Sequence, residues 1–489
     1  MSNLSALLQL IPTLSKSERR SFSQYAALQK RDKAYYNLYE IIRKGKSQNI
    51  EQDFKSQNPD SDYNATVSYL WERLVKTLLT FQGGQAEEEI ILSGILEIKL
   101  LFRKGLVEEA FRLIVRFKEI AKKSEKSDYL LLLEKLELER FSRYQFDGIM
   151  DEGHLVKLQS QLRFNIRYEL NLADHSALYE LLYFRYLQNG NILSDKDKER
   201  LNDLVVSEMN LAGNQRFESF DLNRNHLLFQ SVYFMMTGDH RSSLRTFFEL
   251  DQLFERNSHL WKDSPLVYVN HLRGILNNLF DSNLVNEMDY FIEKLRNLLK
   301  SNSPIIINQA ICVAELKKFI LLRKYESGMF AIEQEFIPLF LHTDSLAGTD
   351  KAELYLFSGL ICFHSKQYKK AAGFLRKIIY LEPTKNNWLW KMIKWLNLLV
   401  NIELNEFDYL LNESGSVERL LKKQGVFYPT DKILMHYVKK IPGCMTRKAK
   451  LLLTKECLNE MELQEKNLYE LQFIKTMGIQ VWLAQKFVN

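Results

Sequence analysis

The sequence has 489 residues, of which 46% are hydrophobic and 26% are charged. A chain of this length exceeds what one hydrophobic core supports, so it must form several domains or extend by repetition. It contains only 19 Gly and 8 Pro. That is too few for an all-β protein, which needs turn residues about every 8–12 positions. The composition therefore favours an all-α architecture built by repetition.

The formal net charge is +6, from 67 Lys and Arg against 61 Asp and Glu. This surplus is small for the length and lacks the dense basic patch that phosphate neutralisation requires, so we do not expect nucleic acid as the partner. The cysteines form no CxxC pair and are too sparse for a disulfide framework or a zinc site. We expect small buried thiols in a reducing compartment at Cys312, Cys362, Cys444 and Cys457.

The amino-terminal residues place the first positive charge at Lys16, after an apolar stretch, which reverses the order of a secretory signal. Apolar segments further along are interrupted by charge, as Lys391 and Lys394 interrupt WLWKMIKWLNLLVNIEL. No run reaches the roughly 20 uninterrupted residues that a membrane span needs. We expect a cytoplasmic protein without a membrane span.

Residues 1–84 are predicted to form an amino-terminal helical cap. Ser15 and Glu18 have the spacing of a capping box, in which each side chain binds a free backbone N–H at a helix start. Apolar residues three and four apart then predict a helix from about residue 34 and a longer one that follows the turn at 58–62. The double glycine Gly83-Gly84 ends this region.

Residues 85–383 are predicted to form helical hairpins of the tetratricopeptide-repeat kind, whose pattern W-x2-L-G-x2-Y, A-x3-F, P repeats every 34 residues. One segment has the aromatic start, the glycine, the alanine and the proline of this pattern, but departs from it at Ser358 and Cys362. Its matching spacings are those of Tyr355, Ser358, Gly359, Cys362, Ala371, Leu375 and Pro383. Small side chains at Gly359 and Ala371 would let the two helices of a hairpin approach to about 8–10 Å.

Weaker copies place a residue at the position of Ala371, after a turn and at the start of a second helix. These residues are Ala110, Ser243, Met288 and Gly328. The spacings from Ser243 through Met288 and Gly328 to Ala371 are 45, 40 and 43 residues. All three are longer than the 34-residue period of the family. Residues 151–215 fit the register badly, with a polar helix start at Ser194. Residues 384–489, with the basic amphipathic segment from Arg447 to Lys455, are predicted to be a carboxy-terminal helical capping region. The expected fold is an all-α, right-handed α-solenoid of degenerate tetratricopeptide-like hairpins with helical caps at both ends.

The segments LSKSERRSF, NLLVNIELNEFDYLLNESGSVERLLKKQ and QVWLAQKF, with the middle hairpins, resemble a group of uncharacterised bacterial all-helical proteins related to tetratricopeptide repeats. The resemblance extends over nearly the whole chain. It implies the architecture, and it implies a scaffold role by analogy with better-known repeat proteins.

In tetratricopeptide arrays the first helix of each hairpin lines a concave groove that holds a peptide or helix of a partner protein. Carried onto this sequence, the groove positions are Arg273, Asn277, Phe280, Lys317, Leu356, Leu360, Phe363 and His364. Leu356 and Leu360 stand where a clamp for an acidic chain end would need Lys or Asn. We therefore expect a non-catalytic protein-binding scaffold with aromatic and aliphatic groove walls and a few basic points. The alternative left open is that the chain's own longer helices fill this groove.

No cluster of residues specifies catalysis, a cofactor site or a metal site. The sequence Gly45-Lys46-Ser47 lacks the earlier glycine of a phosphate-binding loop, since Glu40 stands there. The nine histidines include no HExxH motif and no pair four residues apart. A second hypothesis treats residues 34–82 as a helix-turn-helix-like module of a nucleic-acid-binding regulator. Residues 1–82 carry 12 Lys and Arg against 8 Asp and Glu, a weak basis for it.

Overall fold

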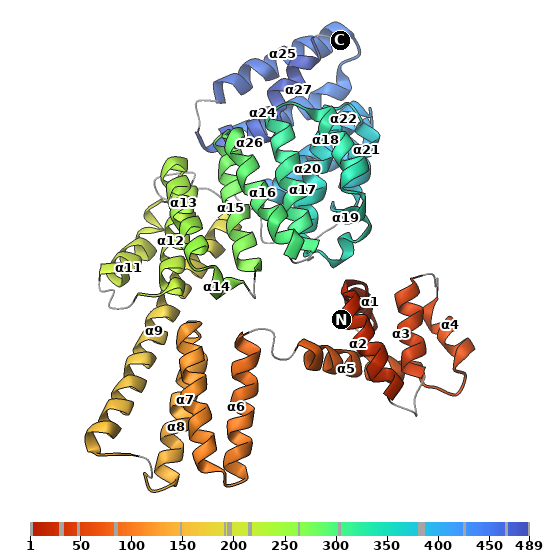
Figure 1. The fold of residues 1–489 in the computed structure, drawn as a ribbon. Helices are drawn as coiled ribbons and strands as arrows, with labels where there is room; N and C mark the ends of the chain where they lie inside the picture. Colours follow the sequence, from red (N-terminus) through yellow and green to blue (C-terminus); the bar gives the residue numbers. More distant parts are fainter. Residues whose placement is uncertain are drawn as a thin grey trace. The chain divides into compact units, whose positions relative to one another are not determined.

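The computed structural model describes residues 3–28, 34–45, 49–82, 87–146, 149–189, 192, 198–213, 218–262, 265–301, 305–379, 387–423, 427–464 and 468–487. All regular secondary structure in these residues is helical, as the low content of Gly and Pro predicts (Figure 1). Most helices pack against their neighbours along the chain. The chain divides into two compact units, Met1–Ile166 and Arg167–Asn489. The domain boundaries predicted from the sequence, at residues 84 and 383, do not coincide with this division and remain predictions.

The first unit begins with α1 (Asn3–Thr13), α2 (Lys16–Leu28), α3 (Ala34–Lys44), α4 (Ile50–Gln57) and α5 (Tyr63–Gln82). Their apolar faces enclose a core around Leu7, Phe22 and Tyr35. The predicted capping box is confirmed, because the backbone N–H of Ser15 donates to Glu18 Oε2 at 2.7 Å and that of Glu18 donates to Ser15 Oγ at 3.2 Å. The predicted stop at Gly83-Gly84 lies outside the described residues.

Three further helices, α6 (Glu87–Arg103), α7 (Val107–Lys123) and α8 (Ser127–Arg143), form a separate core of the first unit. Gly94 brings α6 close to α7, since a Cβ atom at this position would lie 2.2 Å from Cζ of Phe117. A side chain larger than hydrogen therefore does not fit there without a shift of the Phe117 ring.

Helix α9 (Glu152–Asn189) is one continuous helix of 38 residues. The sequence predicts irregular helices for 151–215, because its apolar residues do not follow the hairpin register. The segment after Gly153 nevertheless contains no Gly or Pro up to Asn189, so nothing in it interrupts backbone hydrogen bonding. The predicted helix start at Ser194 lies outside the described residues.

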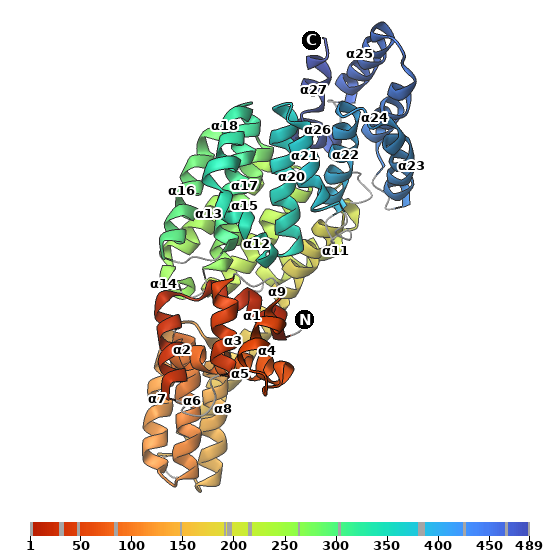
Figure 2. The ribbon, with the colours of Figure 1, turned by 90° about the vertical axis from the view of Figure 1, so that its right-hand side faces the viewer.

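The second unit continues with paired helices (Figure 1). They are α11 (Asn202–Gly213), α12 (Phe220–Met236), α13 (His240–Arg256), α14 (Ser258–Trp261), α15 (Leu266–Asp281), α16 (Val285–Ser301), α17 (Ile305–Leu321), α18 (Tyr325–Phe330), α19 (Ile337–Leu341), α20 (Gly348–His364), α21 (Tyr368–Arg376), α22 (Asn387–Glu403) and α23 (Phe407–Lys423). Its last helices are α24 (Pro429–Lys440), α25 (Arg447–Gln464), α26 (Leu468–Met477) and α27 (Ile479–Gln485). A π-helical turn, Ala331–Glu335, joins α18 to α19, and short 3-10 turns occur at Thr343–Ser345 and Ile441–Gly443. Besides their hairpin partners, α15, α17, α20 and α22 contact one another in this order (Figure 2).

The same three-residue turn closes the hairpins of both units. Its middle residue has a positive φ, and its last backbone N–H bonds a carbonyl five residues earlier, as that of Gln367 bonds Cys362 O at 2.8 Å. This is the Schellman ending of a helix. The positive-φ residues are Gly105, Glu125, Gly238, Asn283, Arg323, Lys366 and Asn405. The turn at Asn405 joins α22 to α23, so the hairpin geometry recurs after residue 383. Pro383 itself lies outside the described residues.

The residues predicted to open the second helix of each hairpin share one structural position. Each is the fourth residue of its helix and each is buried: Ala110, Ser243, Met288, Gly328 and Ala371. A Cβ atom on Gly328 would lie 2.8 Å from Ile361 of α20. One on Gly359 would lie 3.3 Å from Leu396 of α22 and 3.8 Å from Leu375 of α21. Gly359 therefore allows a close approach mainly to the next hairpin rather than to the second helix of its own.

The carboxy-terminal helices contain a buried ion pair that the sequence conceals. Lys391, which breaks an apolar run in the sequence, is 2% exposed. Its ammonium donates to Asp431 Oδ2 at 2.6 Å, while Trp395 Nε1 donates to Asp431 Oδ1 at 2.7 Å. A charge that interrupts an apolar helix thus lies in the core, where a carboxylate from α24 neutralises it.

Candidate functional site

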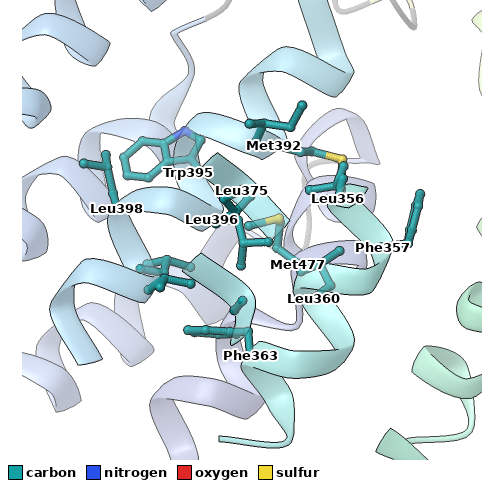
Figure 3. Packing of buried hydrophobic residues seen from close by; sticks show 14 of the residues in the cluster. Leu356, Phe357, Leu360, Phe363, Leu375, Met392, Trp395, Leu396, Leu398 and Met477 are labelled. Atoms are coloured by element: carbon teal, nitrogen blue, oxygen red, sulfur yellow. The ribbon is translucent and has the colours of Figure 1, made fainter. Parts of the chain in front are cut away.

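Three of the predicted groove residues of α20, Leu356, Leu360 and Phe363, lie in the core of the second unit (Figure 3). Leu356 and Leu360 are completely buried, and Phe363 and His364 nearly so. Helices that follow α20 in the chain cover them: the Phe363 ring lies 5.9 Å from that of Trp482, and His364 Nε2 lies 3.1 Å from Met477 O. At these four residues the chain itself fills the predicted groove, which is the alternative that the sequence leaves open.

Three of the other predicted residues, from the two weaker hairpin registers, meet in one charged cluster. We define this cluster as Arg273 and Asn277 of α15, Lys317 of α17, and Asp350 and Glu353 of α20. Arg273 Nη2 lies 2.7 Å from Asp350 Oδ1 and 3.0 Å from Glu353 Oε2. Lys317 Nζ lies 2.7 Å from both Glu353 Oε1 and Asn277 Oδ1. Three neighbouring first helices are therefore cross-linked by polar contacts on one face.

Glu353 is the centre of the charged cluster, because it accepts from both cations. Burial alone would raise its pKa, but Lys317 and Arg273 more than offset this and lower the pKa of Glu353 to about 2. The pKa of Arg273 is raised, since Glu353 and Asp350 outweigh its burial. Glu353 and Arg273 are thus both charged near neutral pH, and the basic points expected of the groove are paired with the chain's own carboxylates.

Aromatic rings support the position of Lys317. Its ammonium lies 4.5 Å from the ring centroid of Phe357 and 5.8 Å from that of Phe280. Phe280, another predicted groove residue, is buried and meets Phe357 edge to face at 6.0 Å. Phe280 therefore belongs to the core beneath the charged cluster and not to an open surface.

Two tyrosines of α9, Tyr183 and Tyr186, interact electrostatically with Glu353 of the charged cluster. Tyr179, Tyr183 and Tyr186 form a stacked row with centroid distances of 5.8 and 6.3 Å. Tyr183 is 40% exposed, yet burial raises its pKa, and Glu353 raises it further against the effect of Arg273.

A small hollow opens at the charged cluster, with room for a group of about the size of one water molecule. Its lining combines charged groups with aliphatic side chains: Arg273, Leu276, Asn277, Ala310, Val313, Ala314, Lys317 and Glu353. These residues offer fixed hydrogen-bond donors and acceptors beside an apolar floor.

A second polar cluster, which the sequence did not indicate, joins α9, α11 and α12. Glu208 Oε1 lies 2.6 Å from His226 Nδ1 and 3.4 Å from His175 Nδ1. Burial opposes ionisation of Glu208, but the two histidines lower its pKa below the usual value. Throughout the part of the chain that the structure describes, no three or more His, Cys, Asp or Glu side chains, including these, are arranged so that they could hold a metal ion. The contact partners come from separate helices, so no local spacing could have predicted them.

The remaining sequence candidates have structural roles where they are described. Cys312, Cys362 and Cys457 are buried, as expected, and Cys444 is partly exposed. Burial raises the pKa values of Cys362 and Cys457 to about 12. Lys46 and Ser47 lie outside the described residues.

The helices of the alternative nucleic-acid module, α3 to α5, form where the sequence predicts them. Val67, Leu70 and Leu74 of α5 are buried in the amino-terminal core, so one face of the longest helix is not available to base edges. Among the described helices, none combines the length and the apolar character needed to cross a lipid bilayer. Neither protein-family models, nor curated proteins, nor solved structures provide a match to the chain.

Proposed function

We propose that this protein is a non-catalytic scaffold that binds a segment of a partner protein on the face formed by α15, α17 and α20. Its hairpins would form a degenerate tetratricopeptide-like solenoid. The repeated Schellman turns, the first helices of 16 or 17 residues in each hairpin, and the contacts between successive first helices support this architecture.

The observation that carries the proposal is the charged cluster itself. Polar side chains from α15, α17 and α20 gather on one face around a small hollow, and the exposed Tyr183 lies nearby. Fixed donors and acceptors beside aromatic side chains are what a surface needs to orient a peptide or a helix. The proposed contact residues are Arg273, Asn277, Lys317, Glu353 and Tyr183.

The pairing within the charged cluster defines the partner's chemistry. Because Glu353 and Asp350 already neutralise Arg273 and Lys317, these two cations of the charged cluster are not free to bind a carboxylate of the partner. The partner segment would instead bring amide or hydroxyl groups to the charged cluster and apolar groups to the tyrosine row. Its binding should then depend only weakly on salt, unlike the binding of nucleic acid.

Co-purification with full-length variants tests this function. Tyr183→Ala removes an exposed ring next to the charged cluster, and Tyr290→Ala is the matched control, since Tyr290 is exposed on α16. Proteins retained by the wild type from its native cell would be identified by mass, then purified and titrated. We expect Tyr183→Ala to weaken binding by about tenfold, as the loss of one interface aromatic does, and Tyr290→Ala to leave it unchanged. Equal affinity of both variants, or steeply salt-dependent capture of DNA or RNA alone, would contradict the proposal.

A further inference from the structure

Helix α6 has apolar residues on two opposite faces, and the described residues of the first unit cover only one of them. The inner face packs on α7 through Ile91, Gly94, Ile95, Ile98 and Phe102, which are all buried. The opposite face presents Leu92, Leu96 and Leu100, which are 44%, 68% and 46% exposed. We call these three residues the leucine stripe. Their spacing of four residues places them in one row along the helix.

The outer face of α6 is symmetric about Leu96. Leu92 and Leu100 lie four residues to either side of it, and Glu89 and Arg103 lie seven residues to either side. At 100° per residue, all five positions fall within about 40° of the direction of Leu96. Along the helix, this face therefore has an acidic residue at one end, three leucines in the middle and a basic residue at the other end. Among the described residues, neither Glu89 nor Arg103 has an ion-pair partner, and Glu89 Oε2 is buried without a hydrogen-bond partner, whereas Glu88 accepts from the Tyr129 hydroxyl at 2.5 Å.

From this symmetry we propose that the leucine stripe is a homodimer interface, in which α6 of a second copy packs antiparallel against α6 with Leu96 facing Leu96 of the partner copy. In that arrangement Leu92 of each copy faces Leu100 of the other, and Glu89 of each copy faces Arg103 of the other. Every contact is therefore made twice, once on each side of Leu96. This is the self-complementary geometry of a two-fold interface. A parallel pairing would instead face like charges at both ends, which is unfavourable. Charge complementarity therefore selects a second copy, in one orientation, as the occupant.

Cysteine cross-linking of the full-length protein tests the orientation. In the antiparallel pair, Leu96→Cys faces its own copy and should form a disulfide-linked dimer under mild oxidation. Leu92→Cys is the matched control, because two copies of residue 92 lie about 12 Å apart along the helix axes, too far for a disulfide. Wild-type protein in the same conditions controls for the native thiols, of which three are buried. Cross-linking at both positions alike, or at neither, would overturn the proposal.

Sedimentation equilibrium of the same full-length protein tests the energetics. The wild type should form dimers, and Leu96→Glu should raise the dissociation constant by about 100-fold or more, since two carboxylates would face each other in an apolar contact. Glu89→Arg should weaken the dimer by about tenfold, and Glu89→Arg with Arg103→Glu should restore it, because the exchange preserves both ion pairs. A monomeric wild type would show that another part of the chain or a different protein covers the leucine stripe, and the proposal would then be wrong. So would a dimer that Leu96→Glu leaves intact.

Discussion

Helices α6 and α20 both have 17 residues, and each opens a hairpin that closes with the same turn, yet their surroundings differ. Every residue from Leu354 to His364 of α20 is buried, because α17, α18, α21 and α22 surround it. Helix α6 packs mainly on α7 and α8 and buries one face. The difference shows that a helix rich in apolar residues does not reveal from its composition whether its own chain covers it. The leucine stripe of α6 is the part left unexplained by the fold.

The largest expected effect comes from making the same substitution in both helices. Leu360→Ala opens a cavity at a completely buried position of α20. We expect it to lower the free energy of unfolding by about 3–4 kcal/mol. Leu96→Ala removes a largely exposed side chain from α6 and should change the stability of the monomer by less than about 0.5 kcal/mol. Urea titration of the full-length variants at low protein concentration measures both. Similar losses would mean that the outer face of α6 is covered within one chain.

The inner face of α6 should be as sensitive as any part of α20. Gly94→Ala would place a Cβ atom 2.2 Å from the Phe117 ring, so that α6 or the ring must shift. We expect a loss of about 2–3 kcal/mol in the free energy of unfolding, as for other overpacked cores. Gly373→Ala in α21 is the control, since a Cβ atom there meets nothing within 4 Å. It should stabilise the protein by up to about 1 kcal/mol. A tolerated Gly94→Ala would show that α6 and α7 are loosely packed.

The sequence predicted the helices, the hairpins and the position of the second-helix residues well, because these depend on local spacing. It did not predict the hairpin turns in detail, since residues such as Arg323 and Lys366 adopt the left-handed conformation that glycine usually signals. These non-glycine residues cost about 1 kcal/mol each, which the packing of the flanking helices offsets. Backbone strain of this kind leaves no mark in the sequence.

The repeat register depends on local spacing, and so it could not show which of the predicted groove residues other parts of the chain would cover. The register gave Arg273, Asn277 and Lys317 as groove residues, and in the structure these three side chains line the same hollow, because the first helices of successive hairpins contact one another. It gave Leu360 as a surface residue, because a simple array of hairpins has nothing beyond its first helices. Here α22 and the helices after it form a further layer over α20. The local sequence of α20 does not indicate contacts with residues more than 100 positions away, such as the contact of His364 with Met477.

The charged cluster should contribute less to stability than the apolar core, but measurably. Glu353→Gln leaves Arg273 and Lys317 without their shared carboxylate. We expect a loss of about 2 kcal/mol near pH 7. Since the pKa of Glu353 is lowered to about 2 in the folded state, its contribution is present above pH about 4.5 and is lost as the pH falls from there towards 2. The variant should therefore show a flatter pH dependence in this window, measured by thermal unfolding from pH 2 to 7.

Glu51→Gln is the control for Glu353→Gln, because the Glu51–Lys55 pair is exposed on both sides. Its removal should change the free energy of unfolding by no more than about 0.5 kcal/mol. If Glu353→Gln behaves like this surface variant, the charged cluster does not hold α15, α17 and α20 together, and its polar groups are more mobile than the structure shows.

The smallest expected effect concerns His271 of α15, which is buried next to Phe254 with ring centroids 5.3 Å apart. Burial, and then the charge of Lys294, lower the pKa of His271 to about 3. In the unfolded chain a histidine titrates near pH 6.5. Between about pH 6.5 and 3 the unfolded chain therefore binds a proton at His271 that the folded chain does not bind. The free energy of unfolding consequently falls as the pH drops through this range. His271→Phe keeps the stacked ring without the proton. Thermal unfolding should show it about 1–2 kcal/mol more stable than the wild type at pH 5 and within about 1 kcal/mol at pH 8. An unaltered pH dependence in His271→Phe would mean that His271 takes up a proton in the folded protein.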